Sequence, residues 1–450
     1  MVRAIVKKTC TRRTMAPFMI DDERQSPAPD FTDSVPMTTK PRPLLPGHES
    51  QNPTQMADVD CVEDISVALE WKLLFPLLAP GAEDPQPSDE RRVVKAQRQN
   101  DRQACLEQGH ECVAQTIREA GEKAVTLHSL LEQGAEEKDL WGSGWVVKKA
   151  NSAEPLDEEK AFKGYIWVPV EICSPKMRFR DPHTRVRMLK VLDALNTGHR
   201  IAANCSCEVH IHLGRMDGRP WSLPTLQRLG TLLWLGEPTL RSIRDPNSPN
   251  FDNTYTWGFS LRQRSRLAKA VENVVSVAGE FHDATIPDRQ VSDTIQRQLS
   301  VPVKDLDAVA EIWRTTSHLE LGQLLSGSEK KYRRLGFNFS AFGEEDERAR
   351  FNPRTMEFRM MDGSVDMDLI MSWFAICGTI AETAVSRTDS RFPAALSLLL
   401  LRSEGGGRLR RSRETLGDRR GREFRELMQA LGVRRQHYRG FEDKIRREHS

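Results

Sequence analysis

The chain lacks the sequence marks of several common protein classes. Its 450 residues include 66 Lys and Arg against 64 Asp and Glu, so a net charge of +2 provides no overall field for nucleic acid or acidic partners. There is no G-x-x-x-x-G-K-[ST] sequence and no G-x-G-x-x-G sequence after a strand, which excludes the commonest phosphate-binding loops. We find no internal repeat. Any functional signal must therefore come from the pattern of individual side chains.

Cysteine usage and the N-terminus bear on the cellular compartment. The eight cysteines form neither a C-x-x-C pair nor a dense framework. Several lie in apolar patterns, where free cysteine behaves as a small hydrophobe, and this usage predicts a reducing, cytoplasmic environment. The basic N-terminus has no apolar run long enough for a signal peptide or membrane span, so we expect no membrane partner. A disordered leader is favoured there, with a mitochondrial presequence as the alternative.

Composition divides the chain into three parts. Hydrophobic residues make up only 38% of the sequence, which indicates that unstructured ends dilute a normal core. Residues 1–62 are rich in Pro, Ser, Asp and Thr without a period, and we expect them to be disordered. A folded domain is predicted at 63–386, followed by a helical, arginine-rich extension at 387–450. This extension mixes Arg with Glu and Asp at helical spacing, which favours internal ion pairs over binding of nucleic acid.

Four segments alternate apolar and ionisable residues with the period of a β-strand, namely 67–73, 166–172, 205–213 and 355–359. One face of each is apolar; in the third, Cys205 and Cys207 belong to that face together with Val209. The opposite faces carry ionisable residues: Glu70, Lys72, Glu171, Glu208, His210, His212, Glu357 and Arg359. Such strands predict a single sheet whose apolar side is covered by helices.

The intervening segments predict helices. Apolar residues recur at helical spacing in 93–121, 122–134, 183–199, 303–325, 366–386 and 393–401, and another helix begins at Ser222. Strands separated by helices, with one sheet face open, indicate an α+β fold with a largely antiparallel sheet.

The ionisable faces suit a particular chemistry. Carboxylates and imidazoles together are ligands for divalent cations, and arginine suits phosphate, so the combination is what a nucleotide-dependent ligase needs. The alternatives are a cross-strand salt bridge for Glu357 and Arg359, and a surface position for Glu171. A zinc site in 205–212 is disfavoured, because alternation turns the two cysteines away from the two histidines.

Five segments, in order, resemble the putative amidoligase family, the fungal-type carboxylate–amine ligases related to glutamine synthetase and gamma-glutamylcysteine ligase. They are ALEWKLLFP (68–76), GWVVKKANS (144–152), YIWVPVEICSP (165–175), SCEVHIHLG (206–214) and RTMEFRMMDGS (354–364). The resemblance covers 63–386. It implies an amidoligase-like catalytic domain with the glutamine-synthetase-like fold, in which a curved sheet forms the floor of an open-ended site.

The resemblance also implies roles for individual residues. It implies metal ligands at Glu70, Glu171, His210 and Glu357, cofactor-binding residues at His210, His212 and Arg359, and catalytic residues at Glu171, Glu357 and Arg359. The implied cofactors are ATP and Mg²⁺ or Mn²⁺. The implied substrates are small-molecule or peptide carboxylates and amines, joined through an acyl phosphate.

Three positions depart from the family's pattern. Lys72 stands where the first strand of the family carries a second glutamate, Ala150 stands in place of an aspartate, and Glu208 in place of a glycine. Lys72 and Ala150 would weaken metal binding, which makes a catalytically weakened relative that binds a ligand or a partner protein the alternative function. A metal-dependent hydrolase using His210 and His212 is disfavoured, because no third nitrogen ligand stands at a suitable spacing.

Overall fold

The computed structural model describes residues 60–98, 101–135, 142–248, 260–272, 286–298, 303–329, 334–343, 354–403 and 414–450. Apart from its last three residues, the segment predicted to be disordered, 1–62, lies outside the described part of the chain. Val59–Ser450 forms one compact unit.

The centre of this unit is a nine-stranded sheet, in which seven strands follow the order β3-β4-β5-β1-β7-β9-β8. These strands are β1 (Ile65–Leu78), β3 (Ala124–Thr126), β4 (Trp145–Lys149), β5 (Tyr165–Cys173), β7 (Glu208–Arg215), β8 (Phe337–Asn338) and β9 (Met356–Asp362). Two short strands, β2 (Val94–Lys95) and β6 (Met177–Arg178), also pair with β1. Only β1–β2 and β3–β4 are parallel among the described pairs, so the predicted α+β class with a mostly antiparallel sheet is confirmed.

The helices of the first half are α1 (Arg102–Glu119), α2 (Leu127–Glu132), α3 (Asp157–Lys160), α4 (Pro182–Gly198), α5 (Leu223–Leu240), α6 (Leu261–Arg264) and α7 (Arg266–Glu272). Those of the second half are α8 (Arg289–Gln296), α9 (Val303–Arg314), α10 (His318–Leu324), α11 (Met367–Val385), α12 (Arg391–Ser403), α13 (Leu416–Ala430) and α14 (Arg435–Glu448). The helices predicted near 183–199, after Ser222, and at 366–386 and 393–401 are confirmed by α4, α5, α11 and α12.

Three predicted helices are wrong in extent. Residues 93–121 begin with strand β2, and α1 starts only at Arg102, where the side chain of Asp101 accepts a hydrogen bond from the Ala104 amide. Residues 122–134 begin with strand β3 before the side chain of Thr126 caps α2. Residues 303–325 form two helices, because the side chain of Ser317 accepts the Glu320 amide and starts α10. Local capping overrides a continuous apolar pattern in all three.

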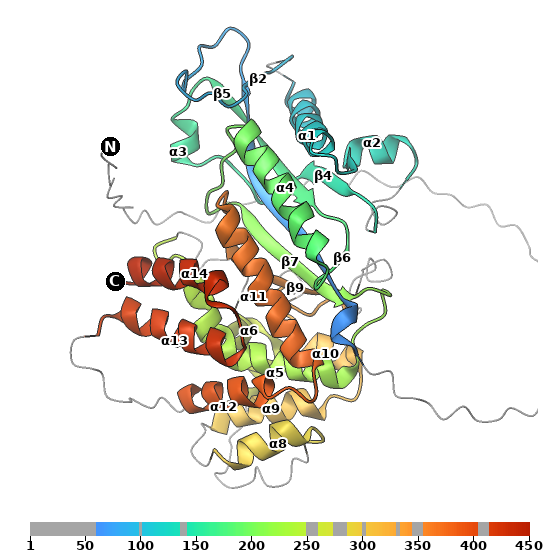
Figure 1. Ribbon diagram of the computed structural model, residues 1–450, viewed down its shortest axis with the longest axis vertical. Helices are drawn as coiled ribbons and strands as arrows, with labels where there is room; N and C mark the ends of the chain where they lie inside the picture. Colours follow the sequence, from blue (N-terminus) through green and yellow to red (C-terminus); the bar gives the residue numbers. More distant parts are fainter. Residues whose placement is uncertain are drawn as a thin grey trace, which may run out of the picture. The chain divides into compact units, whose positions relative to one another are not determined.

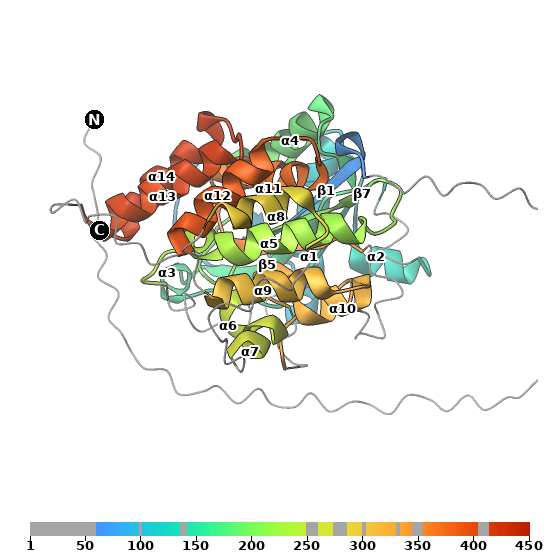
Figure 2. The ribbon, with the colours of Figure 1, turned by 90° about the horizontal axis from the view of Figure 1, so that it is seen from below.

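Helices cover the apolar side of the sheet, as predicted. α1 and α11 contact the strands, and α4 packs between these two helices (Figure 1). The approach of α1 is close: a Cβ atom on Gly109 would lie 2.8 Å from Cγ1 of Val168 in β5. Farther along the same helical layer, the ring of Trp373 in α11 contacts the ring of Phe358 in β9 edge-on, with 6.2 Å between the ring centroids. α5 in turn packs between α11 and α9 (Figure 2).

α11 is central to this layer. Among the described residues it alone is long and apolar enough to cross a membrane, and 83% of its apolar window is buried inside the protein. That burial is the ordinary environment of a core helix and accounts for its composition.

The C-terminal helices pack against the same core. The ring of Phe441 in α14 lies 6.2 Å from that of Trp373, and Lys444 Nζ donates a hydrogen bond to the Ile243 carbonyl at 2.6 Å. The predicted ion pairs are present, for example between Arg425 and Glu442 at 2.9 Å. The boundary predicted at residue 387 stays a prediction.

A buried histidine should make the fold sensitive to acid. His199 Nε2 lies 2.7 Å from the Thr116 hydroxyl, and burial, assisted by the charge of Arg92, lowers the pKa of His199 from 6.5 to about 4. Between these values the unfolded chain binds a proton that the folded chain does not. The free energy of unfolding should therefore fall as pH drops through this window, by about 3 kcal/mol in total. Urea unfolding at pH 7 and pH 4.5 measures the loss, and His199→Gln should show a smaller one. An equal loss in both proteins would contradict the assignment.

Candidate functional site

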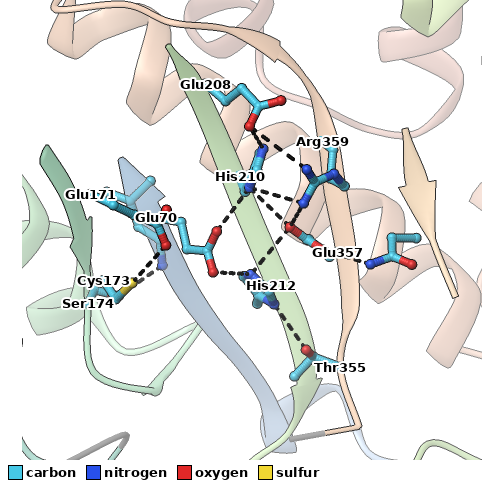
Figure 3. Close-up of polar contacts among 12 residues, drawn as sticks. Glu70, Glu171, Cys173, Ser174, Glu208, His210, His212, Thr355, Glu357 and Arg359 are labelled. Atoms are coloured by element: carbon cyan, nitrogen blue, oxygen red, sulfur yellow. Dashed lines mark hydrogen bonds and ion pairs between the residues drawn. The ribbon is translucent and has the colours of Figure 1, made fainter. Parts of the chain in front are cut away.

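A row of charged and polar side chains crosses the sheet face opposite the helices (Figure 3). We call it the polar stripe; it consists of Lys148, Glu171, Glu70, Lys72, Glu208, His210, His212, Glu357, Arg359 and Asn338. Strand register brings these residues side by side. Lys148 pairs with Glu171 and Glu171 with Lys72, while Glu70 pairs with His210 and Glu357 with both His212 and Asn338. All site residues proposed from the sequence lie on this stripe.

A β-bulge lies beside Arg359. Val209 pairs with Met361 but Ile211 pairs with Phe358, so four residues of β9 lie opposite three of β7 around His210. Strand alternation places Arg359 on the same face as Glu357, and the bulge shifts the register next to it. Arg359 Nη1 lies 3.5 Å from His210 Nδ1, and Nη2 lies 3.8 Å from Glu208 Oε2.

Glu208 and His210 form the fully buried base of the stripe. His210 Nε2 lies 2.9 Å from Glu208 Oε2, and Nδ1 lies 2.9 Å from Glu70 Oε2 and 3.0 Å from Glu357 Oε1. Burial, Arg359 and Lys72 oppose protonation of His210, but the surrounding carboxylates, with Glu208 foremost, raise the pKa of His210 to about 9. The protonated ring then holds carboxylates at both of its nitrogens.

Glu208 carries the opposite charge. Burial alone would raise its pKa, but His210, Lys72 and Arg359 lower it to about 2. Its Oε2 lies 2.5 Å from Lys72 Nζ, so the ammonium that departs from the family's pattern is compensated by the carboxylate that also departs from it. This pairing was not predicted from the sequence.

His212 is the more accessible of the two histidines, and Nε2 makes no hydrogen bond in either of them. Nδ1 lies 3.1 Å from the Thr355 hydroxyl, whereas Nε2 points toward Glu70 Oε1 at 3.2 Å and Glu357 Oε1 at 3.7 Å. Glu70 and His212 are also the more accessible part of this cluster, with 23% and 20% of their side chains exposed. One ligand atom from each of Glu70, His212 and Glu357 lies within 4.8 Å of the others. This donor set fits a divalent cation.

Glu357 is fixed from both of its oxygens. Asn338 donates a hydrogen bond to Oε2 at 2.7 Å, and Arg359 Nη1 donates to Oε1 at 2.5 Å. Burial opposes ionisation, but Arg359 and His212 hold the pKa of Glu357 well below its usual range. Asn338 escaped the sequence analysis because its strand, β8, has only two residues.

Glu171 lies at the other end of the stripe. Its Oε1 is 3.3 Å from Lys148 Nζ, and its Oε2 is 3.9 Å from Lys72 Nζ. Burial and the nearby charge of Glu70 raise the pKa of Glu171. A second group that could hold a cation consists of Glu70, Glu171 and Cys173.

One expectation about the neighbouring segments stays a prediction and one needs correction. Ala150 is buried in a small apolar cluster with Leu74, Ala153 and Cys207, and the weaker metal binding expected from it stays a prediction. The strand predicted from Cys205 begins only at Glu208, because the Cys207 amide turns back to the Asn204 carbonyl at 3.0 Å. Cys207 therefore packs apart from Val209 rather than beside it. No metal-binding group among the described residues combines these cysteines with the histidines.

Comparison with known proteins bears on the same region. Residues 97–274 match a family model described as a putative amidoligase enzyme. No curated protein and no solved structure matches the chain. The matched segment contributes five strands to the sheet, β3 to β7, and three of these, β4, β5 and β7, carry Lys148, Glu171, Glu208, His210 and His212. The match supports a ligase role and confirms the resemblance found in the sequence: residues 97–274 of the chain are similar to the putative amidoligase family.

Proposed function

We propose that the protein is an ATP- and Mg²⁺- or Mn²⁺-dependent carboxylate–amine ligase that forms an amide bond through an acyl phosphate. The observation that carries this proposal is the convergence of Glu70, His212 and Glu357 beside Arg359, with His212 Nε2 left without a hydrogen bond. The family match supports the reaction class. The glutamine-synthetase-like fold and the cytoplasmic location belong to the same proposal.

Glu70, His212 and Glu357 would hold the divalent cation. The Thr355 hydroxyl at His212 Nδ1 fixes the ring so that Nε2 remains available, and Asn338 orients Glu357 in the same manner. A bound cation would neutralise negative charge on the phosphate oxygens. His210, which contacts carboxylates through both nitrogens, would position Glu70 and Glu357 instead of ligating the ion.

Arg359 would bind the transferred phosphoryl group. Its guanidinium is planar and permanently charged, which suits phosphate oxygens. Its side chain is 11% exposed, and its contacts with Glu357 and Glu208 fix the orientation of the fork before a ligand arrives. A preoriented cation of this kind stabilises charge on the phosphoryl group during transfer.

Glu171 would act on the amine. A protonated amine has no lone pair, so it must lose a proton before it attacks the acyl carbon and displaces phosphate. A carboxylate whose pKa is raised is a better proton acceptor, and burial together with Glu70 raises the pKa of Glu171. Glu171 would therefore accept that proton during amide formation.

ATP with Mg²⁺ should stabilise the protein against heat, because the ligand would bind only the folded state. The expected gain is about 2.7 kcal/mol when free ATP exceeds its Kd a hundredfold. Arg359→Lys should bind ATP more weakly, since lysine cannot make two parallel contacts to phosphate. Differential scanning fluorimetry with EDTA as control measures the shift. Calorimetry that finds no ATP binding at millimolar nucleotide would contradict the proposal and favour the partner-binding alternative.

A further inference from the structure

Two lysines flank Glu171 on neighbouring strands. Lys148 of β4, Glu171 of β5 and Lys72 of β1 are directly paired across the sheet, and both ammonium groups lie within 4.0 Å of the Glu171 carboxylate. We call these three residues the lysine row. Lys148 is its accessible end, with 20% of its side chain exposed, while Lys72 is held at the base by Glu208.

The lysine row occupies the place where a second divalent cation would be bound. Glu70, Glu171 and Cys173 offer ligand atoms within 4.8 Å of one another. An ion bound by Glu171 would, however, lie beside two ammonium groups that already neutralise this carboxylate. Because like charges repel strongly where water is scarce, the row disfavours a second ion at this position.

The charge of the whole stripe agrees with a single ion. Its four glutamates face four cations, Lys72, Lys148, Arg359 and the protonated His210, so the stripe carries no net charge when His212 is neutral. One divalent cation would give it two positive charges, which favours an anionic ligand. A second would add two more positive charges beside the lysines.

We propose that Lys72 and Lys148 take the place of a second divalent cation and form a binding subsite for the phosphate groups of a polyphosphate. The site then holds one divalent cation per chain, between Glu70, His212 and Glu357. Lys148 contacts the phosphate oxygens directly, and Lys72 adds positive charge from below. This inference rests on the proposed function, in which the polyphosphate is the triphosphate of ATP.

Adjacent lysines on β4 provide a matched test. Lys148 pairs with Glu171 on the stripe side, whereas Lys149 pairs with Val170, whose side chain lies in the core on the other side of the sheet. In calorimetry with inorganic tripolyphosphate and saturating Mn²⁺, Lys148→Met should weaken binding about tenfold, the loss of one charge-assisted contact. Lys149→Met should bind as the wild type does. Equal affinity in the two variants would overturn the subsite.

Lys72 requires a paired substitution, because its removal alone leaves Glu208 buried without its ammonium. The double variant Lys72→Met/Glu208→Gln removes both charges and should fold, while binding tripolyphosphate more weakly than the wild type. Unchanged affinity in a folded double variant would show that Lys72 has no part in the subsite.

The number of ions is measured separately, by electron paramagnetic resonance titration of Mn²⁺ without nucleotide. One ion per chain is expected, and two ions in the wild type would overturn the inference. If Mn²⁺ and ATP bind but Lys148→Met behaves as Lys149→Met does, the ligase proposal stands and the subsite falls. If the wild type binds neither ATP nor tripolyphosphate, both fall.

Discussion

Glu357→Gln should lower the affinity for Mn²⁺ at least a hundredfold. Glu357 would be a direct ligand, and removal of even an outer group that orients a metal ligand costs about 10- to 100-fold. The affinity for ATP should fall as well, because the same ion would neutralise the charge of the phosphate groups. Electron paramagnetic resonance titration of free Mn²⁺ provides the measurement.

Asn338→Ala is the graded companion to this variant. Asn338 donates to Glu357 Oε2 and is not one of the three proposed ligands. It should therefore weaken Mn²⁺ binding only about tenfold, as expected of an orienting residue. Mn²⁺ binding that is unaffected by Glu357→Gln would remove this carboxylate from the metal site.

Lys72→Glu should destabilise the fold by about 3–5 kcal/mol, which is the usual cost of breaking a buried ion pair. The substitution would replace the 2.5 Å contact between Lys72 and Glu208 with two adjacent carboxylates. Urea unfolding measures the loss. The family's pattern alone predicts a benefit from the same substitution, because a second glutamate in β1 would improve metal binding.

Two controls isolate the pair. The exchange Lys72→Glu/Glu208→Lys should recover part of the lost stability, because it restores opposite charges on the same two strands. Lys149→Glu, an exposed change of equal charge on β4, should alter the free energy of unfolding by no more than about 0.5 kcal/mol. If Lys72→Glu retains wild-type stability and binds Mn²⁺ more tightly, the interpretation from the family's pattern is correct and the compensated pair has no structural role.

Strand alternation accounts for what could be predicted of the site. The period of two is a local property of each strand, so the sequence alone places Glu70 and Lys72 on one face of β1. In the same way it assigns Glu171 and the ionisable residues of β7 and β9 to one face of their own strands. In a sheet with a single apolar side, the ionisable faces of all four strands must lie on the opposite side. The structure confirms this arrangement. The match of residues 97–274 includes β5 and β7 but neither β1 nor β9.

Register and loop conformation could not be predicted, because they depend on contacts between distant segments. The bulge at His210, which shifts the register between β7 and β9, cannot be predicted from a strict alternation. Lys148 lies in the segment 144–152, which resembles the family. Because Lys149 follows it directly, the sequence does not indicate which of the two lysines points to the ionisable face. The turn before Glu208 separates Cys207 from the apolar face, and no periodicity announces it.

We propose that Glu70, His212 and Glu357 bind the divalent cation that serves ATP. Anomalous diffraction from crystals grown with Mn²⁺ and a non-hydrolysable ATP analogue would locate this ion. We expect one protein-bound Mn²⁺ ligated by His212 Nε2 and by the carboxylates of Glu70 and Glu357, with the terminal phosphate against Arg359. An Mn²⁺ ion bound instead by Glu70, Glu171 and Cys173, or a nucleotide bound away from the polar stripe, would contradict it.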